Sequence, residues 1–133
     1  RKVWGKWYEE GGLVVSDRYT TSNAVHQASK LSPEERDTFF RWLYEFEFGK
    51  LGLPKPDLVL YLDMPTGASV SLLRHREAAA YLAACRETAS HAADVLGWQR
   101  IPCTEDGQLR TVEAIHEDIW KAAKDCLTQA EPV

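Results

Sequence analysis

Apolar and polar positions divide the chain into short, nearly continuous apolar runs and longer stretches in which apolar residues recur at helical spacing. The apolar runs predict strands at 13–16, 57–63 and 98–103. The helical spacing predicts helices at about 19–30, 33–48, 78–96 and 112–127. Strands that alternate with helices at these lengths predict right-handed crossovers and a parallel sheet with flanking helices, which is an α/β fold.

The helix predicted at 33–48 carries the clearest start signal. Ser32 stands at the N-cap position, Pro33 at the first helical position and Glu35 three residues past the cap, which together indicate a capping box. The helix is heavily apolar on more than one side. Such a helix is either sandwiched in the core or partly committed to a subunit interface.

Both ends of the chain also carry helical patterns. Residues 1–10 place Val3 and Trp7 at helical spacing, which indicates the tail of an amphipathic helix whose start precedes the sequence. The residues from Thr128 onward are expected to fray. The last helix carries an apolar stripe made of Val112, Ile115, Ile119, Ala122 and Cys126.

Composition is that of an ordinary globular protein and argues against several functions. At 133 residues the chain suits one domain, and its formal net charge of -4 argues against a general nucleic-acid binder. No apolar run approaches the roughly 18 residues of a membrane span, and no signal-peptide pattern opens the sequence. The three cysteines form no C-x-x-C pair, which favours reduced thiols and a cytoplasmic location. The histidines show no metal-ligand spacing.

The residues best suited to chemistry follow the first predicted strand. In open parallel sheets, ligands bind beyond the carboxyl ends of the strands. A polar cluster begins where the run 13–16 ends and continues into the next helical segment, so we expect its side chains to crowd one rim of the sheet. Its members are Asp17, Arg18, Tyr19, Ser22, Asn23, His26 and Gln27.

Arg18 is the best single candidate in this cluster. An arginine just past a buried strand can hold a phosphate with a bidentate fork, and the alternative is an ion pair with Asp17 or Asp63. Asp17 can accept from an arginine or help to hold a magnesium-bound water, or it can cap the following helix. Tyr19 is more typical of packing than of ligand contact.

Asn23, His26 and Gln27 lie at positions i, i+3 and i+4 and therefore share one helix face. An amide there can donate and accept at once, as recognition of a pyrimidine edge demands. From spacing alone, a solvated polar face is the more ordinary interpretation. Ser22 can cap the helix or touch the ligand.

A second basic group, Arg74-His75-Arg76, ends the helical segment that follows the strand at 57–63. Arginines placed over a transferring phosphoryl group stabilise its charge. The alternative is that they are simply cations at a helix C-terminus, which is favourable without any ligand.

Taken in order, these motifs resemble the thymidylate kinase family along nearly the whole chain. The landmarks are Gly11-Gly12, Val14-Val15-Ser16-Asp17-Arg18-Tyr19, Ser22-Asn23 with Gln27, Leu53-Pro54-Lys55-Pro56-Asp57-Leu58, Tyr61-Leu62-Asp63, Arg74 and Arg76. The resemblance implies a P-loop nucleoside-monophosphate-kinase fold and a homodimer formed through helices flanking the site. It also implies ATP-dependent phosphorylation of thymidine monophosphate (dTMP) to the diphosphate, with Mg2+, in dTTP synthesis.

The resemblance also implies roles for individual residues. Arg18 looks like the contact to the acceptor phosphate. Ser22, Asn23 and Gln27 look like the nucleobase side of the site, and Arg74 and Arg76 look like the start of the lid arginines.

The sequence departs from the family pattern in two places. No G-x-x-x-x-G-K-[ST] loop for ATP phosphates occurs in the 133 residues. In the family that loop follows a strand lying between those matching 13–16 and 58–63. We therefore expect 1–133 to be a single partial kinase domain, the C-terminal portion of a longer protein or one completed by another chain, inactive as it stands. The lid, at about 74–80, looks shortened.

Two other functions stay open at this point. One is a related nucleoside or nucleotide kinase with another base preference. The other is a non-catalytic binding or dimerisation module that kept the scaffold after losing the phosphate loop.

Overall fold

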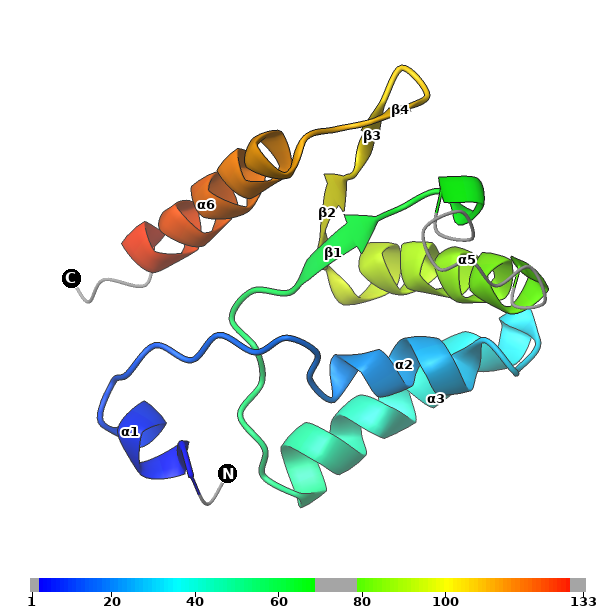
Figure 1. The fold of residues 1–133 in the computed structure, drawn as a ribbon. Helices are drawn as coiled ribbons and strands as arrows, with labels where there is room; N and C mark the ends of the chain where they lie inside the picture. The colour runs from blue at the N-terminus through cyan, green and yellow to red at the C-terminus, as the bar shows by residue number, and fades with distance from the viewer. Residues whose placement is uncertain (1–2, 69–78, 130–133) are drawn as a thin grey trace.

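The computed structural model describes residues 3–68 and 79–129 (Figure 1). Helices make up most of this part of the chain. They are α1 (Gly5–Glu9), α2 (Thr21–Ala28), α3 (Pro33–Tyr44), the π-helical segment η1 (Glu45–Lys50), α5 (Ala79–Leu96) and α6 (Val112–Gln129). The strands are β1 (Leu60–Asp63), β2 (Gln99–Pro102), β3 (Thr104–Glu105) and β4 (Gln108–Leu109).

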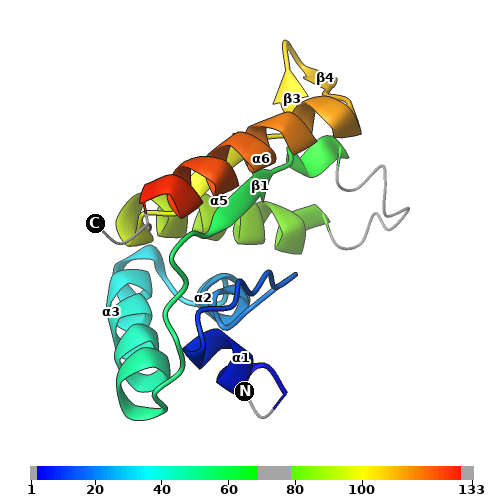
Figure 2. The ribbon, with the colours of Figure 1, turned by 90° about the vertical axis from the view of Figure 1, so that its left-hand side faces the viewer.

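A parallel pair of strands, β1 and β2, forms the sheet that the helices cover. Leu60 lies opposite Gln99 and Asp63 lies opposite Pro102, in one continuous register. Figures 1 and 2 show α5 on one face of this pair and α6 on the other. The arrangement confirms the predicted α/β class, the parallel pairing, and the second and third predicted strands.

The first predicted strand does not form. Residues 13–16 belong to no strand, Val15 is 88% exposed and Leu13 is exposed as well. A strand is stabilised by the hydrogen bonds of a neighbouring strand and by burial of its side chains, and the described residues offer this run neither. The polar cluster therefore follows a loop and not the end of a paired strand.

The core of the helical part lies where α2, α3 and α5 meet. Phe40 of α3 is 1% exposed and belongs to a buried cluster with Ala24 and Ala28 of α2, Leu43, and Ala92 of α5. Alanines at such positions let helices approach closely, and the single large ring fills the space between them. This packing fixes α2 against α5, and so places the polar residues of α2.

The start of α3 follows its sequence signal. The hydroxyl and the backbone N–H of Ser32 both donate to the Glu35 carboxylate, over 2.8 and 3.1 Å, within a complete capping box. These bonds hold the pKa of Glu35 below its ordinary value. After Tyr44 the helix widens into η1, which ends at Lys50, so the helix predicted at 33–48 forms but changes type near its end. Segments of π-helix occur frequently at functional sites.

The two ends of the described chain differ from their predicted packing. In the described N-terminal residues the helix is α1, five residues long, and the apolar residues Val3 and Trp7 are exposed. All five residues of the apolar stripe lie in α6, where Ala122 is buried and Val112 is 79% exposed. Thr128 lies inside α6 and not in a frayed tail.

Candidate functional site

The polar cluster occupies the loop before α2 and the first two turns of that helix. Thr20 is the residue at the N-cap position of α2, and its side chain makes no capping bond. Ser22 lies inside the first turn of the helix. The alternatives in which Asp17 or Ser22 caps the helix are therefore wrong.

Arg18 lies on this loop with an exposed side chain. No ion pair between described residues includes it, and Asp63, one of its alternative partners, pairs instead with Arg86 at 3.0 Å. The backbone of Arg18 has a φ of 61°, a region that residues other than glycine rarely occupy. The hydroxyl of Ser16 donates to the Arg18 carbonyl over 2.6 Å and stabilises this turn. The guanidinium is therefore available to a ligand.

Tyr19 anchors the loop to a second segment of the chain. Its hydroxyl donates to the carbonyl of Pro54 over 3.1 Å, and its side chain is half-buried. Pro54 belongs to the extended approach to β1, 35 residues further along the chain. The bond thus ties the loop that carries Arg18 to the segment leading into the sheet.

The three polar residues on one face of α2 have different surroundings. Nδ2 of Asn23 donates to Oε1 of Glu47 in η1 over 3.4 Å. Nδ1 of His26 lies 3.0 Å from the hydroxyl of Tyr81 in α5, and the two rings stack with centroids 6.4 Å apart. Gln27 is exposed. The face is therefore more than a solvated surface, because two of its members contact neighbouring helices.

Glu47 and Tyr81 are the site neighbours that sequence reasoning missed. Glu47 stands between Phe46 and Phe48, and a carboxylate inside an apolar segment is a signal that could have pointed to it. Tyr81 carries no such signal, because its contact with His26 depends on the packing of α5 against α2. A hydrogen bond with the thiol of Cys85 raises the pKa of Tyr81.

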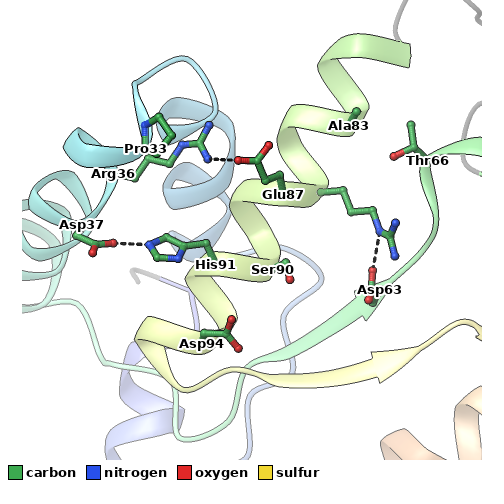
Figure 3. A pocket seen from close by; sticks show the side chains of 11 residues that line it. Pro33, Arg36, Asp37, Asp63, Thr66, Ala83, Glu87, Ser90, His91 and Asp94 are labelled. Atoms are coloured by element: carbon green, nitrogen blue, oxygen red, sulfur yellow. Dashed lines mark hydrogen bonds and ion pairs between the residues drawn. The ribbon is translucent and has the colours of Figure 1, made fainter.

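A second candidate region is a hollow of about 760 Å³ between α3, α5 and the carboxyl end of β1 (Figure 3). Asp63 and Thr66 line it from the side of β1. Its position is that of a ligand site in an open α/β sheet. No residue of the polar cluster lines this hollow, so the structure does not bring the two regions together.

The charged side chains around the hollow are paired with one another. Every carboxylate in its described lining lies against a basic side chain, and several of the pairs join different elements. Figure 3 shows the pairs that Glu87, Asp63 and Asp37 form. The pairs are Arg36–Glu87 at 3.0 Å, Arg86–Asp63 at 3.0 Å, His91–Asp37 at 2.5 Å and Arg100–Asp94 at 2.8 Å. These contacts fix α5 against α3 and β1, and they give each lining carboxylate a hydrogen-bond partner.

Burial raises the pKa of two groups, one in β1 and one just after β2. Burial, followed by the negative charge of Asp63, raises the pKa of Tyr61 to about 12. Burial is also the main cause of a raised pKa at the thiol of Cys103. Both groups therefore stay protonated at neutral pH, so a thiolate nucleophile is not what this edge of the sheet offers.

The lid arginines and a metal site are not placed by the structure. Arg74 and Arg76, with most of the lid at about 74–80, lie outside the described residues. Within residues 3–68 and 79–129, no three side chains of the metal-binding types gather closely enough to hold an ion. In the same two ranges, no helix has both the length and the apolar character needed to cross a membrane.

Part of the sequence is similar to curated proteins of known activity. Two thymidylate kinases of Mycobacterium tuberculosis, from strains CDC 1551 / Oshkosh and ATCC 25618 / H37Rv, are each 42% identical to this chain over 45 residues. The matched stretch covers 34% of this chain and 21%, about a fifth, of the length of each relative. No model of a protein family matches the chain, and no solved structure matches it.

Proposed function

We propose that this chain is the acceptor-binding part of a thymidylate kinase, which transfers the γ-phosphoryl group of ATP to dTMP. The observation that carries the proposal is the 45-residue stretch that is 42% identical to the thymidylate kinases of M. tuberculosis. The parallel strand pair with helices on both faces is compatible with such a fold. In the reaction, an oxygen of the dTMP phosphate bonds to the γ-phosphorus, the bond to the bridging oxygen of ATP breaks, and ADP leaves.

Arg18 would hold the acceptor phosphate in this proposal. Its exposed guanidinium has no ion-pair partner among the described residues, so two parallel N–H bonds to phosphate oxygens would not compete with an existing pair. Phosphoryl transfer depends chiefly on positioning and charge stabilisation, which an arginine fork supplies. Asp17 would accept from that guanidinium or from a magnesium-bound water. The bond from Tyr19 to Pro54 would keep the loop in place.

The first turns of α2 would form the nucleoside side of the site. Ser22, Asn23 and Gln27 would take the nucleobase side, because an amide can match a base edge that offers a donor beside an acceptor. His26 would line the same site from its contact with Tyr81.

ATP, Mg2+ and the lid arginines Arg74 and Arg76 would complete the site, and this half of the proposal rests on the family resemblance. Magnesium in phosphoryl-transfer sites is held largely by phosphates, by water and by one or two carboxylates. Asp17 can supply one such carboxylate, next to the proposed phosphate contact. The residues of the loop before α2 and of α2 itself therefore fit the acceptor half of the reaction.

We expect the full-length protein to form dTDP and ADP from dTMP and ATP. A coupled assay of ADP release would compare dTMP with the monophosphates of uridine, deoxycytidine and guanosine at matched concentrations. The highest kcat/KM with dTMP would support the proposal. A higher value with another monophosphate would make the protein a related kinase. Calorimetric dTMP binding without turnover would favour the non-catalytic binding module.

We also propose a homodimer formed through an aromatic row on α3 and η1. Trp42 is exposed, its ring stacks on Phe46 with centroids 5.5 Å apart, and Phe39 lies 5.8 Å from it. Exposed aromatic side chains in a row are typical of protein interfaces. Trp42→Glu is expected to convert a dimer into a monomer in sedimentation equilibrium, with Trp120→Glu on α6 as the exposed control. A wild-type mass of one chain would contradict the dimer.

A further inference from the structure

We infer that Glu47 is a positioning residue that fixes the side-chain amide of Asn23, so that Asn23 presents its carbonyl oxygen to the nucleobase. The inference rests on the proposed function and names a residue that the family resemblance did not assign. It concerns specificity, because the direction of that amide decides which base edge can bind.

The surroundings of Glu47 are unusual for a carboxylate. The residue is only 5% exposed, lies in the π-helical segment η1 and is flanked by aromatic residues in the sequence. Its Oε1 accepts from Nδ2 of Asn23, while its Oε2 is buried and has no hydrogen-bond partner among the described residues. No ion pair between described residues includes it. Burying a carboxylate with one oxygen left without a partner is costly, and such a group calls for a role other than stability.

A hydrogen-bond acceptor at position 47 decides the direction of the Asn23 amide. Nδ2 of Asn23 donates to Oε1 of Glu47, so the NH2 group of the amide faces the carboxylate. Its Oδ1 then lies on the opposite side of the planar amide, and Asn23 is exposed. The amide therefore offers an acceptor at the ligand side of α2.

An outward carbonyl selects among pyrimidines by simple hydrogen-bond chemistry. The ring N3 of thymine or uracil carries a hydrogen and can donate to Oδ1 of Asn23. The ring N3 of cytosine is an acceptor, so it would face another acceptor and leave both groups unpaired. Glu47 would thus favour a base with an N3–H edge, although it need not touch the base itself.

The test uses the full-length, nitrogen-15-labelled protein with Glu47→Met, Glu47→Gln and the control Glu45→Met. Glu45 is an exposed carboxylate of the same segment η1. The first measurement follows the side-chain NH2 signals of Asn23, assigned by their loss in Asn23→Ala. We expect slow exchange of one of these protons in the wild type, faster exchange in Glu47→Met and recovery in Glu47→Gln, whose carbonyl can still accept. Glu45→Met should leave the signals in place.

The second measurement is the ratio of the dissociation constants of deoxycytidine and thymidine monophosphates. We expect Glu47→Met to lower this ratio about tenfold, the effect of about one hydrogen bond, and Glu47→Gln to restore most of it. A merely structural role would shift the melting temperature and both affinities together, and would leave the ratio unchanged.

The outcomes separate the inference from the proposed function. Unchanged Asn23 signals in Glu47→Met overturn the inference, and so does an unchanged ratio in a protein that binds dTMP. If the wild-type protein binds neither nucleotide, the proposed function fails. The exchange of the Asn23 amide still decides then whether Glu47 holds that side chain.

Discussion

Replacing Arg18 with alanine is expected to lower kcat/KM for dTMP about a hundredfold or more in the full-length protein. Each charge-assisted hydrogen bond contributes about 1.5–3 kcal/mol, and a bidentate fork on a phosphate makes two of them. Arg18 has no ion pair within the described chain, so the substitution leaves no new unpaired charge in the fold. Steady-state kinetics with dTMP as the varied substrate would measure the loss.

The backbone of Arg18 allows a sharper version of the same experiment. Its φ of 61° strains any residue with a Cβ and is relaxed for glycine. Arg18→Gly should therefore be about 1 kcal/mol more stable than Arg18→Ala and equally inactive. Arg18→Lys keeps the charge but loses the fork, so its kcat/KM should lie between those of wild type and alanine.

Arg41→Ala is the matched control, since it removes an exposed arginine from α3. It should leave kcat/KM within about twofold of wild type, as expected for a surface change far from the reacting groups. An equal loss of activity in Arg41→Ala and Arg18→Ala would contradict the role of Arg18. So would a loss in Arg18→Ala that merely follows the fraction of unfolded protein.

The parts of the fold that could be predicted from the sequence depend on local rules. The start of α3 follows from Ser32 and Glu35, because a capping box acts between residues three positions apart. The pair β1 and β2 follows from two apolar runs separated by a helix, since a helical crossover is the usual connection between parallel strands.

The strand predicted at 13–16 failed for a non-local reason. Its apolar residues suit a buried strand, but a strand forms only where a second strand lies beside it to accept and donate its hydrogen bonds. Within the described chain the sheet consists of β1 and β2, with β3 and β4 in a separate hairpin. An apolar run shows what a segment can bury, and the rest of the fold decides whether it is buried.

Like the fold, the candidate site could be predicted from the sequence only where local rules decide it. The polar residues of α2 follow from helical spacing, and the helix forms where it was expected. Their partners Glu47 and Tyr81 lie 24 and 55 residues away in the sequence, so only the packing of α2 against η1 and α5 brings them close. Spacing alone could therefore name Asn23 and His26, but not the contacts that orient them.

The packing that orients these residues depends most on one side chain, Phe40. Replacing it with alanine is expected to lower the free energy of unfolding by about 3–5 kcal/mol, a large share of the 5–15 kcal/mol of a typical domain. Its neighbours Ala24, Ala28 and Ala92 have short side chains that cannot move into the space, so a cavity would remain. Urea unfolding, followed by far-ultraviolet circular dichroism, would measure the change.

Trp120→Ala is the matched control, because Trp120 is also a helical aromatic residue but is 55% exposed. Its truncation should cost about 1 kcal/mol or less, since much of its ring already contacts water. Equal losses in the two variants would contradict the place of Phe40 at the centre of the core.

Because α2 meets α5 through this cluster, Phe40→Ala should also loosen the contact of His26 with Tyr81. A variant that loses stability but keeps the nucleotide selectivity of wild type would show that the core and the site are independent.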